Sequence, residues 1–160
     1  MKTGAARCGF TIIELVVVIA LIAIMIGIYL VVANPAGQLA SSRNSERLLD
    51  LQAIMNAIYS NRYDQTNEQF LCSSAGALPV GTSSAKFMAS ASTSANYNIG
   101  PCLAPTYISV LPFDPSASGT YYNTPSDYST GFKVSINSSG TVITLSAPYA
   151  ELNKTVSVSR

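Results

Sequence analysis

Histidine and tryptophan are both absent from this 160-residue sequence, and only 11% of its residues are charged. Without histidine, the usual general base near neutral pH and the most common metal ligand are missing. The formal net charge is +1 and no basic run occurs, so we expect no nucleic-acid partner. No paired carboxylates or other catalytic constellation stand out, which argues against an enzyme. We also expect no cofactor and no metal ion.

Cysteine is scarce too, with Cys8 before the longest apolar run and Cys72 and Cys102 after it. If the N-terminal piece is removed, two cysteines remain, which is the number needed for one disulfide. A Cys72–Cys102 bridge would close a loop of about thirty residues, and the loop-entropy model gives this roughly 3–4 kcal/mol. Such a bond implies a compartment outside the cytosol. The alternative is two free, buried thiols.

The most informative feature is an apolar run near the N-terminus. Residues 10–33 read FTIIELVVVIALIAIMIGIYLVVA, and the nineteen residues 15–33 carry no charge. At ~1.5 Å per residue they span roughly 28 Å, close to the ~30 Å hydrocarbon core of a bilayer. We therefore predict one transmembrane helix over residues 10–33, with Glu14 as the single acid at its start.

The residues before this run, MKTGAARCG, contain Lys2 and Arg7 and no acid. Positive residues at this place hold the N-terminus in the cytoplasm, and the rest of the chain is translocated. An ordinary secretory signal would be cleaved after the apolar region, but Asn34-Pro35 follows that region at once. The basic leader instead ends at Gly9, directly before the apolar run.

The segment Gly9-Phe10-Thr11-Ile12-Ile13-Glu14-Leu15 resembles the processing motif of type IV prepilins and the related pseudopilins. The shared features are a short basic leader, a terminal glycine, a phenylalanine, a glutamate four residues later and a long apolar helix. The resemblance implies that a prepilin peptidase, which is also an N-methyltransferase, cuts between Gly9 and Phe10 and methylates Phe10. Loss of the two leader cations, Lys2 and Arg7, changes the formal net charge from +1 to −1.

The same resemblance implies a role for Glu14. A charge at the bilayer centre costs ~2.5–3.5 kcal/mol on insertion scales and less near the edge, and such residues usually mark function. Cleavage leaves a positive α-amino group on Phe10. In this family the glutamate of one subunit pairs with the amine of its neighbour, which offsets both desolvation penalties and fixes the register between helices. The alternative is a glutamate that reaches water at the headgroup level.

Residues 34–63 are expected to continue the helix as the spine of a globular part. Asn34-Pro35-Ala36-Gly37 interrupts the apolar pattern, which predicts a kink or locally melted turn; the alternative is a plain end of the membrane helix. From residue 38 to about residue 63 the pattern is helical again. One face is apolar, with Leu48, Leu51, Met55, Ile58 and Tyr59. The charged residues are expected on an ordinary solvated face, namely Arg43, Glu46, Arg47, Asp50 and Arg62.

Residues 64–160 are expected to form a globular head with a connecting loop and an antiparallel sheet. Residues 64–98 are rich in small polar residues and predict a long loop, with a short strand or turn near residues 86–89. The following segment, residues 107–115 leading into Tyr121-Tyr122, looks like the entry to the sheet in many pseudopilins and simple bacterial pilins. Asp114 is expected to accept backbone donors in this turn. A calcium site is disfavoured because only Asp114 and Asp127 supply carboxylates nearby.

A β-hairpin is predicted where apolar and polar residues alternate on both sides of a turn. Gly131 opens the first strand, residues 137–140 turn, and residues 141–147 return. Tyr121-Tyr122 and residues 155–159 are candidates for further strands. The expected fold is α+β and similar to type IV pilins: a long N-terminal helix, with a membrane half and an amphipathic half, packed on a small antiparallel sheet.

The function implied by the resemblance is that of a structural subunit in a type IV pilus-like filament. Its partners would be further copies of itself, the prepilin peptidase, an assembly platform in the inner membrane, and membrane lipid. The precursor, with residues 1–9 as its leader peptide, would be a single-pass inner-membrane protein, and the assembled form an extracellular pilus or a periplasmic fibre. The alternative function is a pseudopilin of a type II secretion or DNA-uptake machine.

Overall fold

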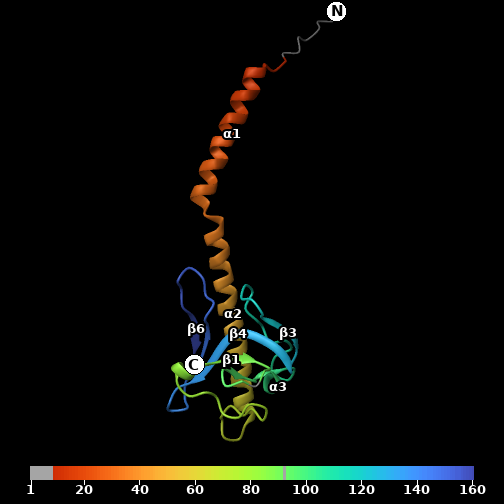
Figure 1. The fold of residues 1–160 in the computed structure, drawn as a ribbon, viewed down its shortest axis with the longest axis vertical. Helices are drawn as coiled ribbons and strands as arrows, with labels where there is room; N and C mark the ends of the chain where they lie inside the picture. Colours follow the sequence, from red (N-terminus) through yellow and green to blue (C-terminus); the bar gives the residue numbers. More distant parts are fainter. Residues whose placement is uncertain (1–8, 92) are drawn as a thin grey trace, which may run out of the picture. The chain divides into compact units, whose positions relative to one another are not determined.

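The computed structural model describes residues 9–91 and 93–160 (Figure 1). Most of the expected leader, residues 1–8, therefore lies outside the described residues. The chain divides into two compact units, the first ending at Gln38 and the second comprising Leu39–Arg160. We call the second one the globular unit. It includes most of the second helix, because that helix supplies part of its core.

The first unit contains the helix α1, Ile12–Ala33, in which apolar residues are nearly continuous. Asn34 is the C-cap of this helix, and its backbone is left-handed with φ 38° and ψ 63°. Pro35 then opens α2, Pro35–Asp64, since proline is tolerated in a first helical turn. The Asn34 side chain accepts a hydrogen bond from the Gly37 amide at 3.2 Å. The predicted interruption is thus a break of one residue with its own cap, not a melted turn.

Six strands form one sheet in the globular unit. They are β1, Lys86–Ala89; β2, Asn96–Tyr97; β3, Tyr121–Thr124; β4, Asp127–Ile136; β5, Ile143–Ala147; and β6, Val156–Ser159. Their order is β2-β1-β4-β5-β6, and β3 also pairs with β4. Two short helical segments accompany them, η1, Thr82–Ser84, and α3, Gly100–Leu103.

The sheet differs from the expectation in two respects. It is mixed, because β1 and β2 pair in parallel, whereas the other pairs are antiparallel. The strand expected to open at Gly131 begins four residues earlier, at Asp127. Gly131 lies inside β4 with φ +76°, and a Cβ there would come within 2.7 Å of Thr120 Cγ2. Glycine is therefore needed where this strand bends, not where it begins.

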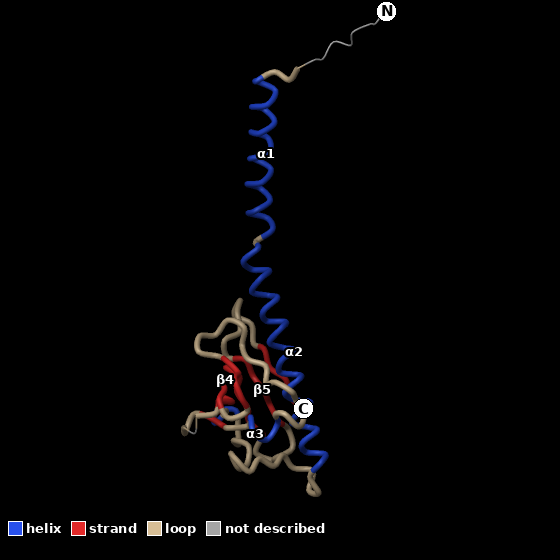
Figure 2. Tube along the Cα trace, turned by 90° about the vertical axis from the view of Figure 1, so that its right-hand side faces the viewer, coloured by secondary structure: helices blue, strands red, loops and turns tan. Residues whose placement is uncertain are grey.

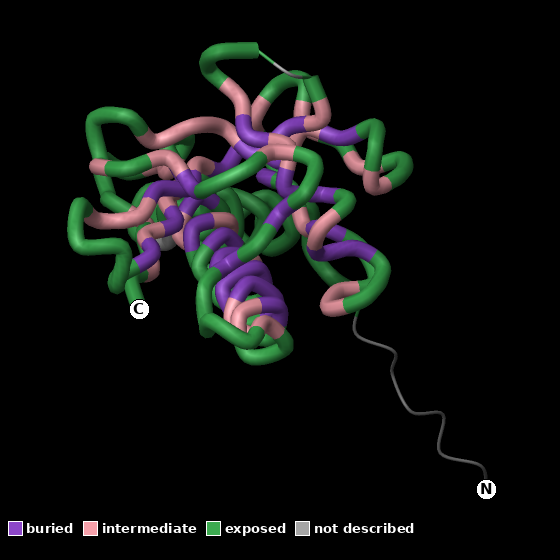
Figure 3. The backbone as a smooth tube through the Cα atoms, turned by 90° about the horizontal axis from the view of Figure 1, so that it is seen from below, coloured by how far each residue is buried: buried purple, intermediate pink, exposed green. Residues whose placement is uncertain are grey.

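The core lies between α2 and one face of the sheet (Figures 2 and 3). As predicted, Leu51, Met55 and Ile58 are buried in it. The fully buried strand residues that join them are Phe132, Val134, Ile143 and Leu145. Figure 3 shows buried positions gathered towards the middle of the globular unit, with exposed loops around them.

Two positions on α2 were assigned to the wrong face. Leu48 was expected in the core but is 39% exposed, whereas Arg47 was expected in solvent but is fully buried. The buried positions recur at intervals of four and three residues: Ala40, Asn44, Arg47, Leu51, Ile54 and Ile58. Arg47 lies in this row, and Leu48 lies beside it. The polar Asn44 and Arg47 thus lie in the first part of the buried face, apolar residues follow, and the polar Asn61 is buried near its end.

Candidate processing and assembly site

Gly9 and Phe10 precede α1 in a segment without regular secondary structure, and both are exposed. A Cβ built on Gly9 has no atom within 4 Å, so packing against the described residues does not require glycine at this position. Phe10 exposes 83% of its surface. A glycine that local packing does not require, next to an exposed phenylalanine, is consistent with a segment that binds in the cleft of another protein.

Thr11 fixes where α1 begins. Its hydroxyl oxygen accepts a hydrogen bond from the Glu14 amide at 3.3 Å, which is the geometry of an N-cap. The sequence pattern Thr-x-x-Glu is that of a capping box, a signal that the sequence analysis missed. Only one of the two reciprocal bonds of that motif is present, because the Glu14 carboxylate makes no bond back to Thr11.

Glu14 is therefore in the first turn of α1 and is exposed. Its carboxylate has no hydrogen-bond or ion-pair partner within residues 9–91 and 93–160. The positive end of the helix dipole favours an acid at this place, but only by about 0.3–1 kcal/mol. A carboxylate at the edge of a long apolar helix thus remains available for a cation that the described residues do not supply.

The rest of α1 is apolar on all sides. Its large apolar side chains expose between 45% and 85% of their surface, the extremes being Val18 and Ile12. Among the described residues, one helical stretch, which starts at Ile12, is long and apolar enough to cross a membrane. A helix that is apolar all round requires lipid or other apolar helices around it.

Residues 4–30 match the family model described as the prokaryotic N-terminal methylation motif. This is the type IV prepilin signature. It indicates a type IV pilin-like or pseudopilin chain and suggests a structural subunit, and it implies processing by a prepilin peptidase and a membrane-anchored precursor. Comparison with the curated proteins and with the solved structures finds no match. The α+β architecture, with its apolar N-terminal helix, is consistent with a pilin-like fold.

In the globular unit, a buried polar cluster joins α2 to two loops. The Arg47 guanidinium lies 2.8 Å from Asp114 Oδ2 through Nε and 3.0 Å from Oδ1 through Nη2. It also donates to the Ser116 hydroxyl at 2.6 Å and to the Asn44 side-chain oxygen at 2.8 Å. Each nitrogen of this buried guanidinium thus donates to an acceptor, which is the condition for burying a charge.

Asp114 forms the turn that the sequence predicts. It accepts hydrogen bonds from the Ser116 and Ala117 amides, both at 3.0 Å. Burial alone would raise the pKa of this carboxyl, but the bonds from Arg47 and the two amides outweigh burial and lower it. Asp127 is bonded instead to Tyr121 and Asn123. The carboxylates of Asp114 and Asp127, which were considered as calcium ligands, are therefore hydrogen-bonded to different partners.

The second loop is held through Glu151. Arg43 donates to Glu151 Oε1 at 2.7 Å and also pairs with Oε2, while Asn44 donates to the Glu151 main-chain oxygen at 2.8 Å. The Asn44 side-chain oxygen accepts from the Glu151 amide at 2.9 Å. Hydrogen bonds from Arg43 are the main reason that the pKa of Glu151 falls to about 2. Charge-assisted bonds thus attach this loop to the first turns of α2.

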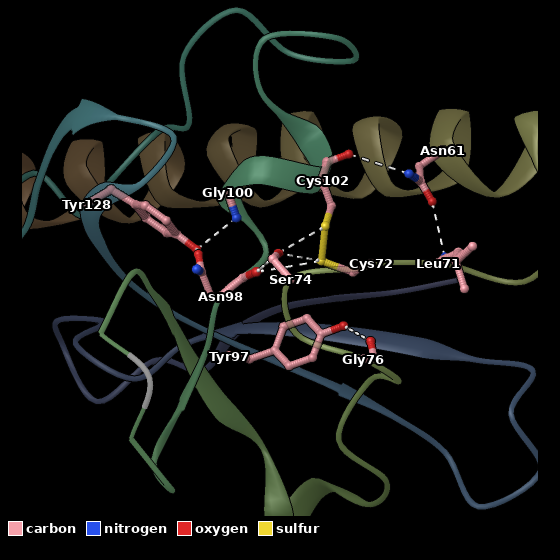
Figure 4. Close-up of a disulfide and its surroundings, with 10 residues drawn as sticks. All are labelled: Asn61, Leu71, Cys72, Ser74, Gly76, Tyr97, Asn98, Gly100, Cys102 and Tyr128. Carbon is pink, nitrogen blue, oxygen red and sulfur yellow. Dashed lines mark hydrogen bonds between the residues drawn. A yellow bond between two sulfur atoms is a disulfide. The ribbon is translucent and has the colours of Figure 1, made fainter.

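At the other end of the globular unit, the disulfide Cys72–Cys102 joins the long loop to α3 (Figure 4). The S–S distance is 2.01 Å. The buried Asn61 of α2 donates to the Cys102 main-chain oxygen at 3.4 Å and accepts from the Leu71 amide at 3.3 Å. Ser74 donates to the Asn98 main-chain oxygen at 3.0 Å. The bridge and these bonds fix a loop that has few apolar anchors of its own.

Proposed function

We propose that this chain is the structural subunit of a type IV pilus-like filament. In this proposal residues 1–9 are a leader that the prepilin peptidase removes, and the same enzyme methylates Phe10. Residues 10–33 anchor the precursor in the inner membrane and later form the filament core. Residues 34–63 continue the helical spine, and residues 64–160 complete the head at the filament surface. An assembly platform in the inner membrane moves the subunit from lipid into the polymer.

The observation that carries this proposal is the uncommitted Glu14 at the start of a helix that is apolar on all sides, within the prepilin signature. After cleavage the nearest new cation in the sequence is the α-amino group of Phe10. Pairing of Glu14 with the amine of a neighbouring subunit removes both charges from apolar surroundings together. It also fixes the axial position of one helix against the next.

The N-terminus of the isolated mature chain tests the processing step. We expect mass spectrometry to find a chain that begins with N-methylated Phe10, and electron microscopy of sheared surface material to show filaments. A mature chain that begins at Met1 contradicts the proposal.

The pairing step is tested by Glu14→Ala, with Glu46→Ala as the control, since Glu46 is an exposed glutamate of α2. We expect Glu14→Ala to be inserted and processed but to give few filaments, and Glu46→Ala to assemble normally. A normal filament yield from Glu14→Ala would refute the pairing role of Glu14.

A pseudopilin of a type II secretion or DNA-uptake machine is the second candidate. The turn built on Asp114 after residues 107–113 favours it, because this segment is similar to the sheet entry of pseudopilins. The long serine-rich loop favours a surface pilus instead. Imaging separates the two, since a pseudopilin forms a short periplasmic fibre and a pilin forms filaments outside the cell.

A further inference from the structure

We propose that Leu152 of one subunit inserts into an apolar pocket at the opposite end of the globular unit of a second copy. This inference deepens the proposed filament function and rests on it. The two surfaces are the loop that carries Leu152, between β5 and β6, and a pocket beside the C-terminal end of α2.

Leu152 has a backbone conformation that its side chain disfavours. Its φ is +60°, in the left-handed region, and the next residue, Asn153, follows with φ +53°. A bulky residue with positive φ is a genuine outlier, and such strain collects at functional sites. The Leu152 side chain is also 49% exposed, so no burial within the chain compensates for the strain. An apolar side chain is therefore held out towards solvent at an energetic cost.

The loop that presents Leu152 is rigidly supported. The preceding residue, Glu151, is bonded through its side chain to Arg43 and through both main-chain groups to Asn44. Arg47, itself fully buried, reaches the same carboxylate at 3.4 Å. The polar cluster therefore determines where Leu152 points, and a pre-organised side chain loses less entropy when it binds.

The pocket has a volume of about 210 Å³, whereas about 10–15 Å³ holds one water molecule. Its walls are mostly apolar, with Phe70, Leu78, Val80, Ile136 and Ile143 among them. Val80 is 57% exposed although it lines this hollow. The polar residues Arg62 and Gln69 also line it. Such a site suits one branched aliphatic side chain that arrives from outside.

Leu152 cannot fill the pocket of its own chain. Its loop is bonded to Asn44 of α2, whereas the pocket is lined by Arg62 of the same helix. These two positions are eighteen residues apart, about 27 Å along a helix that rises ~1.5 Å per residue. Leu152 can therefore enter this pocket only from another copy.

One pair of opposite charges, Lys154 and Glu68, can meet across the two surfaces, although Arg62 in the pocket wall is itself a cation. Lys154 follows the Leu152 turn, and its ammonium group has no carboxylate partner among the residues that the structure describes. Glu68 precedes the pocket-lining Gln69, and its main-chain oxygen accepts from the pocket-lining Arg62 at 2.9 Å. The Glu68 carboxylate is exposed and likewise has no cation partner in the described part of the chain. Insertion of Leu152 would bring Lys154 of one copy towards Glu68 of the next.

A contact between two different surfaces is heterologous. Unlike a two-fold contact, it leaves one free donor surface and one free acceptor surface at the ends, so it propagates into an open polymer unless the rotation closes a ring. The contact between globular units thus has the symmetry that a filament requires.

Cysteine crosslinking in the processed full-length chain tests the contact in cells that assemble it. We expect Leu152→Cys combined with Val80→Cys to give a ladder of oxidised oligomers on a non-reducing gel. Leu152→Cys combined with Val110→Cys is the matched control, because Val110 is 54% exposed, close to the 57% of Val80, but does not line the pocket. In a second arm, Lys154→Glu should lower filament yield about 1.4- to 5-fold, the range for an exposed ion pair. Glu68→Lys in the same chain should restore the yield.

The outcomes separate this inference from the proposed function. A ladder with Val80→Cys and none with Val110→Cys supports it, as does rescue by the charge exchange. If filaments form but both cysteine pairs give the same result, the contact is refuted while the filament function stands. If the unaltered chain forms no polymer, both the proposed function and the contact are wrong.

Discussion

Arg47 on α2 and Asp114 in the loop before β3 form an ion pair with both side chains at 0% exposure. Sixty-seven residues separate them in the sequence, and the two bonds of the pair are 2.8 and 3.0 Å long. The pair joins the helix to the turn that leads into the sheet. Arg47 also donates a hydrogen bond to the Glu151 carboxylate. The pair therefore contributes both to the stability of the globular unit and to the position of the loop that carries Leu152.

Removal of one partner of this pair should be severe. Arg47→Met leaves the Asp114 carboxylate buried without its cation, and loss of one partner of a buried pair typically costs 3–5 kcal/mol. We expect urea denaturation of the detergent-solubilised chain to show a loss of this size. The double variant Arg47→Met with Asp114→Asn should recover part of it, because asparagine can still accept bonds from the Ser116 and Ala117 amides. Equal losses in the single and double variants would contradict this account.

Secondary structure was largely predictable because local patterns determine it. The apolar run predicts α1, alternation predicts β4 and β5, and the strand near residues 86–89 is found at the expected place. The strand β2 was missed because it has two residues and depends on a parallel pairing with β1. No alternation can be recognised in two residues.

The polar cluster was not predictable from the same patterns. Arg47 was assigned to solvent because only apolar residues were counted, and this also put Leu48 in the core. The available signal was that Arg47 lies in the same helical row as Ala40, Asn44 and Leu51. The partner carboxylates, Asp114 and Glu151, are far away in the sequence, and local rules do not connect distant charges. Buried ion pairs depend on tertiary structure, which explains the error.

Acid should weaken the attachment of the Leu152 loop. The pKa of Glu151 is lowered to about 2 in the folded chain, from a usual value near 4.5. A group with a lowered folded pKa contributes stability that is fully present above the unfolded pKa and is lost as pH falls through the folded value. We therefore expect the melting temperature to fall between about pH 4.5 and pH 2, and less steeply in Glu151→Gln. Because Asp114 also has a lowered pKa, the variant should keep part of the slope. Identical slopes in both chains would exclude this role for Glu151.

Loss of the disulfide should affect the long loop most. Cys72 and Cys102 are thirty residues apart, and the loop-entropy model gives about 3–4 kcal/mol for such a bridge. We expect the variant with Cys72→Ser and Cys102→Ser to lose stability of this order in the same denaturation assay. Proteolysis should then begin within residues 65–85, before β1, since Phe70 and Leu78 are the buried apolar residues that hold this segment besides Cys72. The unaltered chain is the control, and a cut elsewhere in the globular unit would contradict the expectation.

Leu152→Gly should separate stability from assembly. Glycine adopts positive φ without the penalty of about 1–2 kcal/mol that a side chain incurs, but it also gains freedom in the unfolded chain, worth about 0.5–1 kcal/mol. The net expectation is a small gain in the melting temperature of the detergent-solubilised chain. Filament yield should fall, because the side chain that enters the neighbouring pocket is gone. Val110→Gly is the control for loss of an exposed apolar side chain, and it should leave the yield unchanged. If Leu152→Gly raised stability and assembled normally, the strain at Leu152 would need an explanation other than contact with a second copy.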